Sequence, residues 1–168
     1  MPQGTEFRVN STTTGKQTAP AIGVDHEGDF VVVWMSFGQE GSGYGIYAQR
    51  YDAVGSTRGA EFLVNTFTTG SQTTPVIGID SEGDFVVAWT SEGQDDSYSG
   101  IYAQRFNSAG APLGSEFRVN SSTLNDQKSP AIGMNADGNF VIGWVSGREA
   151  GNGAAWDDIY AQRYDASG

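Results

Sequence analysis

The chain contains no cysteine, one histidine and no long hydrophobic run. The lack of cysteine excludes a disulfide framework and zinc sites built on thiolates. No apolar stretch approaches the roughly 20 residues that a transmembrane helix needs. The start, MPQGTEF, also lacks the basic and apolar regions of a signal peptide. We therefore predict no membrane insertion and no signal peptide within this chain.

Basic side chains are scarce as well. Nine Lys and Arg stand against 20 Asp and Glu, and the formal net charge is -11. Such a charge repels the phosphate backbone of nucleic acids and favours solubility. We therefore predict no nucleic-acid partner.

What the chain does contain is a repeat. EFRVN at 6–10, EFLVN at 61–65 and EFRVN at 116–120 are each 55 residues apart, as are Trp34, Trp89 and Trp144. Only the third unit differs in length, because Ile101 and Ile159 are 58 residues apart. A fixed period of this kind decides the fold class before local structure does. We predict one domain over 1–168, with repeats at about 4–58, 59–113 and 114–168.

Each unit has four short segments whose apolar and β-branched residues are typical of strands, and no segment shows a helical period. In the first unit these segments are EFRVN, PAIGVD, FVVVW and IYAQRYD. The turn between the second and third reads HEGD, SEGD or ADGN, and an acidic residue followed by Gly suits a tight hairpin. The fold class predicted is all-β, with three four-stranded propeller-type blades.

A complete propeller ring has four to eight blades, so three blades leave two open faces. Two identical chains would close a six-bladed β-propeller as a homodimer. The EFRVN segment at 6–10 would then complete the last blade of the partner as a swapped N-terminal strand. The strand count leaves open an alternative, a closed threefold β-trefoil or β-prism.

The order QTAPAIGVDHEGDFVVVW, then YGIYAQRYDAVG, then EFLVN resembles the blades of sialidase-like (Asp-box, or BNR) β-propellers. It is closely similar to tandem repeats of large secreted or surface bacterial proteins. The resemblance covers essentially the whole chain and implies an extracellular or cell-surface location. It does not imply sialidase activity, because Arg58 stands where the Asp-box has its aromatic residue.

The longer and more variable loops lie on one face of such blades, and binding residues usually lie on such loops. Each of these loops carries an aromatic residue with acidic residues near it. An exposed ring can pack on a sugar while carboxylates accept its hydroxyl groups. The candidate carbohydrate-binding residues are Tyr44, Tyr98, Trp156, Glu40, Asp95, Asp96, Asp157 and Asp158. The alternative is that the rings cover the blade ends.

Cofactor chemistry has little support in the sequence. The paired acids of these loops allow Ca²⁺, which prefers oxygen ligands, and we predict no other cofactor. His26 lies in a predicted hairpin turn and has Ser81 and Ala136 as its repeat equivalents, which argues against a histidine-based triad. We predict no catalytic residues.

An arginine occupies the same position in each of the three repeats, and it resembles the arginines that clamp the carboxylate of sialic acid in sialidases. Its repetition in every unit instead favours structural ion pairs with glutamates that also repeat. The arginines are Arg50, Arg105 and Arg163, and the glutamates are Glu6, Glu61 and Glu116.

The function predicted is a non-enzymatic binding or adhesion module, carbohydrate-binding and lectin-like, from a larger repeat protein. One alternative is a purely structural spacer without a small ligand. The other is a glycoside hydrolase, which needs two carboxylates flanking the scissile bond, and spacing in sequence does not show such a pair.

Overall fold

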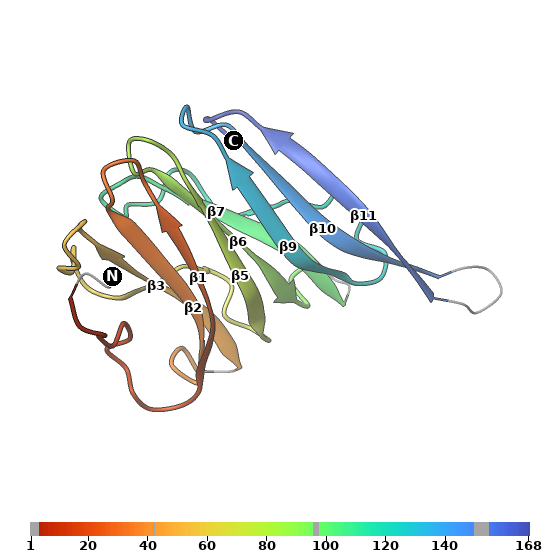
Figure 1. The fold of residues 1–168 in the computed structure, drawn as a ribbon. Helices are drawn as coiled ribbons and strands as arrows, with labels where there is room; N and C mark the ends of the chain where they lie inside the picture. The colour runs from red at the N-terminus through yellow and green to blue at the C-terminus, as the bar shows by residue number, and fades with distance from the viewer. Residues whose placement is uncertain (1–3, 42, 96–97, 150–154) are drawn as a thin grey trace.

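The structure is a computed structural model that describes residues 4–41, 43–95, 98–149 and 155–168. Within these residues the regular structure consists of strands, arranged in three separate antiparallel sheets that fan out side by side (Figure 1). We call these sheets blade 1, blade 2 and blade 3 in chain order. The prediction of an all-β chain with three blade-like sheets is confirmed.

Blades 1 and 2 have four strands each and blade 3 has three. Blade 1 contains β1 (Gln17–Val24), β2 (Phe30–Phe37), β3 (Tyr44–Tyr51) and β4 (Phe62–Leu63) in that order. Blade 2 contains β5 (Gln72–Ile79), β6 (Phe85–Glu92), β7 (Ser99–Phe106) and β8 (Phe117–Arg118). Blade 3 contains β9 (Gln127–Met134), β10 (Phe140–Glu149) and β11 (Ala155–Tyr164).

The innermost strand of each blade lies against that of the next, β1 against β5 and β5 against β9. The three sheets therefore surround one axis as an open sector of a propeller. They do not close into a barrel, so the alternative of a closed threefold β-trefoil or β-prism is wrong. No helix that could span a membrane occurs among the residues described.

The core lies between the blades. Val31 and Val33 of β2 face blade 2 and pack with Val87 and Trp89, and the equivalent residues of blade 2 pack against blade 3. Central strands are therefore covered on both faces in blades 1 and 2, as their apolar sequences predict. Blade 3 differs, because Val141 on its outward face is 39% exposed.

The F-x-V-N segments form the fourth strands, but only two residues of each pair in a ladder. Tyr47 pairs with Leu63 and Ala48 pairs with Phe62. Beyond the ladder, the buried Asn65 side chain accepts the Ile46 amide at 2.7 Å, so a side chain takes over the pairing.

The first copy of this segment, residues 6–10, is not in a strand. It instead covers blade 1, with Val9 packed on Val32 and Trp34 and with the Phe7 ring 5.3 Å from the Tyr51 ring. A fourth strand pairs with the third strand of a blade. Among the described residues, β3 and β7 already pair with β4 and β8, and residues 6–10 pair with no third strand.

Each inner strand carries a β-bulge before its proline. The pairing of β1 with β2 skips Ala19 and Pro20, and the same shift occurs in β5 between Thr73 and Val76. The residue before each proline has a positive φ, 51° at Ala19, 51° at Thr74 and 54° at Ser129. Proline cannot donate to the ladder, so the bulge lies where a ladder hydrogen bond is lost anyway.

Candidate functional site

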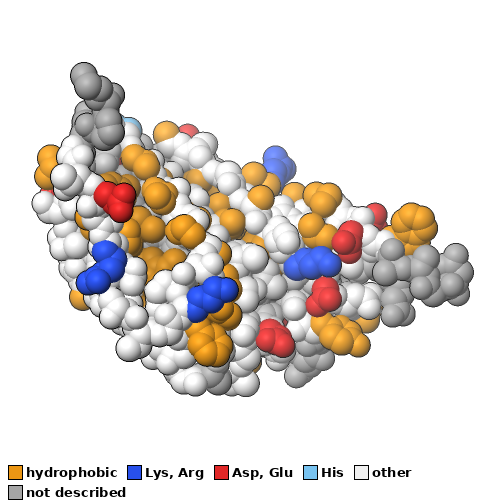
Figure 2. All heavy atoms as spheres, turned by 60° about the horizontal axis from the view of Figure 1, so that its bottom comes forward, with side chains coloured by type: hydrophobic (Ala, Val, Ile, Leu, Met, Phe, Trp, Pro, Cys, Tyr) orange, Lys and Arg blue, Asp and Glu red, His pale blue; other side chains and the backbone are white. Residues whose placement is uncertain are grey.

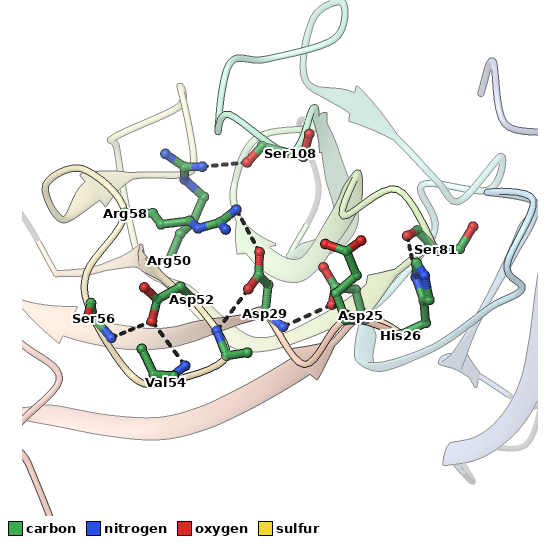
Figure 3. Close-up of polar contacts among 12 residues, drawn as sticks. Asp25, His26, Asp29, Arg50, Asp52, Val54, Ser56, Arg58, Ser81 and Ser108 are labelled. Atoms are coloured by element: carbon green, nitrogen blue, oxygen red, sulfur yellow. Dashed lines mark hydrogen bonds and ion pairs between the residues drawn. The ribbon is translucent and has the colours of Figure 1, made fainter.

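The face with the short hairpins carries a cluster of acidic and basic residues between blades 1 and 2 (Figure 3). Asp25 Oδ1 accepts the amides of Glu27 and Asp29, both at 2.9 Å. Asp29 accepts the Ala53 amide at 2.8 Å through Oδ1 and pairs with Arg58 Nη1 at 2.6 Å through Oδ2. These carboxylates hold the β1–β2 hairpin and the β3–β4 turn together, so we assign them to the scaffold.

Other polar side chains of this face connect one blade to the next. His26 Nδ1 lies 2.8 Å from the Ser81 carbonyl oxygen, and Arg50 Nη1 donates to the Ser108 carbonyl (Figure 3). Arg105 repeats the second contact by donating to the Ala166 carbonyl at 2.6 Å. His26 thus lies at a blade junction.

The predicted pairing of Arg50, Arg105 and Arg163 with Glu6, Glu61 and Glu116 is therefore wrong. Side chains alternate along β3, and Arg50 reaches toward blade 2. Glu61 lies near Tyr47 on the other face of the blade, where it makes different contacts.

A different pair of carboxyl groups lies in blade 1, around the β2–β3 loop. Glu40 of this loop accepts a hydrogen bond from Asn65 Nδ2 at 3.1 Å through Oε2. Its Oε1 is buried and has no hydrogen bond among the residues described. The carboxyl group lies so close to Gly45 that a Cβ there would be 2.4 Å from Oε1. Burial raises the pKa of Glu40, and the hydrogen bond from Asn65 only partly opposes this shift.

Glu61 lies directly before β4, and its surroundings shift its pKa in the opposite direction. Oε1 accepts from Gln39 Nε2 at 2.7 Å, and Oε2 accepts the Ser11 amide at 2.7 Å and the Ser11 hydroxyl at 2.9 Å. Burial by itself would raise the pKa of Glu61, but hydrogen bonds from Gln39, Ser11 and Thr12 outweigh it and lower that pKa. Its ionised form is therefore the stabilised one.

Tyr47 lies within electrostatic reach of both acids. Burial raises the pKa of its phenol, and the charges of Glu40 and Glu61 raise it further. Blade 1 therefore holds two carboxyl groups near one phenol, one with a raised pKa and one with a lowered pKa. Neighbouring acids with opposite pKa shifts are the arrangement that general acid–base chemistry uses.

Blade 2 repeats much of this cluster. Gln94 Nε2 donates to Glu116 Oε1 at 2.6 Å, and the Thr66 amide donates to Oε2 at 2.6 Å. Asp95 takes the position of Glu40, and both of its carboxyl oxygens are buried without a hydrogen bond among the described residues. Sequence reasoning included Glu40 and Asp95 but missed Glu61 and Glu116 as site residues. The available signal was the glutamate ahead of each F-x-V-N segment, which we interpreted as an arginine partner.

The predicted carbohydrate-binding aromatic residues are spread over three blades and are not brought together. Tyr44 is half-buried with its ring 5.1 Å from that of Phe37, so it covers a blade end. Tyr98 and Trp156 are 72% and 57% exposed.

Among the predicted acidic residues outside blade 1, Asp157 Oδ2 lies 3.7 Å from Lys128 Nζ. Asp158 lines a pocket of about 230 Å³ in blade 3, and Asp96 lies outside the described residues. Within the part of the chain that the structure describes, no group of three or more Asp, Glu or His side chains is arranged to hold a metal ion. Whether the predicted residues bind carbohydrate stays a prediction.

No family model and no curated protein matches this chain. The resemblance to sialidase-like repeats therefore stays a prediction. Solved structures do match. An endo-arabinase from Bacteroides thetaiotaomicron VPI-5482 is similar with a TM-score of 0.57 and 16% identity, over 92% of this chain and 58% of that one. An endo-1,4-beta-xylanase from the same organism is similar with a TM-score of 0.52 and 10% identity, over 96% of this chain and 64% of that one.

These similarities extend to the fold, and the chain spans less than two thirds of the length of either structure. They contradict the predicted function. We predicted a non-enzymatic, lectin-like adhesion module, with a structural spacer and a glycoside hydrolase as alternatives. The two solved structures named above, which share this fold, are instead an endo-arabinase and an endo-1,4-beta-xylanase. The prediction failed because strand pattern and loop composition do not distinguish a propeller that binds sugars from one that cleaves them.

Proposed function

We propose that this chain is the blade unit of a glycoside hydrolase, with Glu40 and Glu61 as its acid and base. The observation that carries the proposal is the pair itself. Two carboxyl groups from separate elements lie near Tyr47, and their surroundings move their pKa values in opposite directions. Glycoside hydrolysis needs one carboxylic acid that donates a proton and one carboxylate.

The roles follow from the hydrogen bonds. Glu40, whose pKa is raised by burial, would give its proton to the oxygen of the glycosidic bond as that bond breaks. Glu61, kept ionised by Gln39 and Ser11, would take a proton from the water that attacks the anomeric carbon. The proton lost by Glu40 is thus balanced by the proton gained by Glu61.

The proposed substrate is a polysaccharide. The two solved neighbours are named for endo-acting cleavage of polymers, an arabinase and a xylanase, which makes arabinan and xylan the first substrates to test. The exposed rings of Tyr98 and Trp156 offer surfaces on which sugar units could pack. A polymer substrate would also place the protein outside the cell, at the extracellular or cell-surface location that the repeat resemblance implies.

We include a six-bladed ring of two chains in this proposal. Three blades are too few for a complete propeller, and two copies would supply six. A ring would give the polymer a continuous surface around the axis.

The test is release of reducing ends from arabinan and xylan. Glu40→Gln and Glu61→Gln are each expected to lower kcat by about 10²- to 10⁴-fold, the usual contribution of a positioned acid or base. Glu40→Gln should also remove the fall of activity at high pH, because the raised pKa of Glu40 sets that limb.

The matched control is Glu82→Gln, on an exposed glutamate of the opposite face, which should leave activity unchanged. The pair Asp95→Asn and Glu116→Gln measures whether blade 2 contributes. Absence of turnover on all tested polysaccharides, or full activity of both blade 1 variants, would show that the proposal is wrong.

A further inference from the structure

Blade 1 and blade 3 lie at the two ends of the fan (Figure 1). Blade 3 presents an outward face that in blades 1 and 2 is covered by the next blade. Blade 1 presents the face that in blades 2 and 3 is covered by the preceding blade. The contacts that occur at both junctions within the chain therefore show which residues a third junction of the same kind would use.

The third strand shows the uncovered face of blade 3 most clearly. Ile46 of β3 and Ile101 of β7 are both 0% exposed, whereas their equivalent in β11, Ile159, is 77% exposed. The neighbouring Ala48 and Ala103 are likewise 0% exposed, and Ala161 is exposed. Strand β11 thus carries an interface sequence without its interface.

The inner strands also differ between blade 3 and the other two blades, at a glycine that repeats in each blade. A Cβ at Gly23 would lie 3.2 Å from Ile79 Cγ2 of the next blade, and one at Gly78 would lie 2.9 Å from Met134 Cβ. At Gly133 of blade 3 the nearest atom is Val141 Cγ1 of the same blade, at 3.8 Å. The position next to Gly133 that a neighbouring inner strand would fill is therefore open.

Blade 1 carries the side chains that fit this position. Ile22 and Val24 are the repeat equivalents of Ile77 and Ile79, and they are 61% and 57% exposed. A hollow of about 190 Å³ next to them is lined by residues that include Val9 and Pro20. Figure 2 shows hydrophobic side chains gathered in a hollow toward the end of the molecule that carries blade 1.

Polar contacts follow the same series. Arg50 donates to the Ser108 carbonyl of blade 2, and Arg105 donates to the Ala166 carbonyl of blade 3. Arg163 is the next arginine, is exposed and borders an open concavity of about 700 Å³. The repeat equivalent of Ser108 and Ala166 is Ala53, in the β3–β4 turn. The acceptor for Arg163 would therefore be the Ala53 carbonyl in blade 1 of another copy.

The fourth strand provides the last correspondence. Glu61 accepts the amide and hydroxyl of Ser11, and Glu116 does the same with Thr66. Ser121 of blade 3 has no hydrogen bond among the described residues, and neither has Glu6. The segment at 6–10 already packs on blade 1, while β11 has no fourth strand beside it within the described chain.

We propose that blade 3 of one copy docks on blade 1 of a second copy, with residues 6–10 of the second copy added beside β11 of the first. The register of β4 and β8 places Phe7 opposite Ala161 and Arg8 opposite Tyr160. Glu6 then accepts from Ser121, and Arg163 donates to the Ala53 carbonyl. Because the junction is head to tail, two copies form it twice and close a ring of six blades.

This inference does not depend on hydrolysis, because its first readout is a mass measured without substrate. Light scattering after size exclusion is expected to give twice the chain mass of 17.8 kDa. One chain mass at all concentrations, or open-ended assemblies that grow with concentration, would overturn it.

Two variants test the head-to-tail geometry. Ile159→Asp damages the blade 3 face and Ile22→Asp damages the blade 1 face, and both side chains are exposed in one copy, so each copy should still fold. Each variant alone is expected to weaken association by at least about a hundredfold, as for a central interface residue. An equimolar mixture should recover a dimer, because one undamaged junction remains. A face that pairs with itself would leave one of the variants dimeric, and that result would overturn the proposal.

Tyr98→Asp is the matched control, an exposed hydrophobic residue in a loop of blade 2, and it should stay dimeric. Hydrogen exchange on the unmodified protein gives a second readout. The amides of β11 and of residues 6–10 should exchange more slowly as protein concentration rises. Exchange that is independent of concentration would contradict the strand addition.

Discussion

At the scale of single residues, Glu40 and Glu61 differ in their surroundings more than in their chemistry. Glu40 accepts from Asn65 and has an oxygen buried without a partner among the described residues, whereas Glu61 accepts hydrogen bonds from Gln39, Ser11 and Thr12. Burial favours the neutral carboxyl group and donated hydrogen bonds favour the carboxylate. The same residue type therefore has its pKa shifted in opposite directions at two positions of one blade.

The pH dependence of stability should report on Glu61. Its pKa is lowered in the folded state, so its contribution is complete above the usual pKa of a glutamate and is lost as the pH falls through the folded value. Glu61→Gln is expected to lower the free energy of unfolding at pH 7 by about 1 kcal/mol. It should also flatten the loss of stability on the acid side.

Urea unfolding at several pH values measures both effects. Glu27→Gln, in an exposed hairpin, is the control and should reproduce the pH profile of the unmodified protein. An unaltered acid limb in Glu61→Gln would contradict the assignment of Glu61 as the ionised member of the pair.

At the scale of elements, the inner strands combine a bulge, a proline and a residue with positive φ. This backbone region costs a residue with a Cβ roughly 1–2 kcal/mol. The same conformation recurs at Ala19, Thr74 and Ser129. The bulge therefore belongs to the way each inner strand is built, and it bends the strand near its start.

Ala19→Gly is expected to stabilise the protein, by up to about 1 kcal/mol, because glycine adopts a φ of 51° without a steric penalty. Ala21→Gly, two residues further along the same strand, has no such relief. It should destabilise by roughly 0.5–1 kcal/mol through the larger entropy of the unfolded chain. Thermal unfolding of both variants compares them directly, and a loss of stability in Ala19→Gly would show that the bulge is not strained.

At the scale of the whole molecule, stability resides in the junctions between blades. Adjacent blades bury their central strands against each other, as Val33 and Trp89 do between blades 1 and 2. The open faces of blades 1 and 3 are then the least satisfied parts of the molecule, which is why self-association is expected there.

Gly78 and Gly133 are equivalent positions in blades 2 and 3, and substituting each of them compares a junction within the chain with the proposed junction between two copies. Gly78→Ala should destabilise each chain by about 1–3 kcal/mol, because the new methyl group overpacks the junction with Met134. Gly133→Ala should stabilise a single chain by roughly 0.5–1 kcal/mol, because alanine lowers the entropy of the unfolded chain and meets nothing closer than 3.8 Å. It should weaken association by about tenfold or more, a change of about 1.4 kcal/mol. Unfolding and sedimentation measured on both variants separate the two effects. Equal effects of both substitutions on chain stability would contradict the equivalence of the two junctions.

The sequence by itself determined the architecture of this protein. A period of 55 residues with strand-forming segments predicted three blades, and the hairpins at HEGD, SEGD and ADGN lie where the acidic–Gly pairs predicted them. Such features follow from alternation, turn chemistry and repetition, all of which are local along the chain.

Only the tertiary structure decided which side chains meet. Arg50 and Glu61 looked like partners in the sequence, yet Arg50 on β3 reaches toward blade 2 while Glu61, directly before β4, lies near Tyr47 on the other face of the blade. Glu40 and Glu61 come from different elements and share Tyr47 only after the sheet has formed. Likewise Ile46 and Ile159 are the same residue in the repeat, and their burial differs because only one of them has a blade beside it. Burial, pKa and partner choice depend on contacts between segments distant in the chain, and a repeat pattern does not contain them.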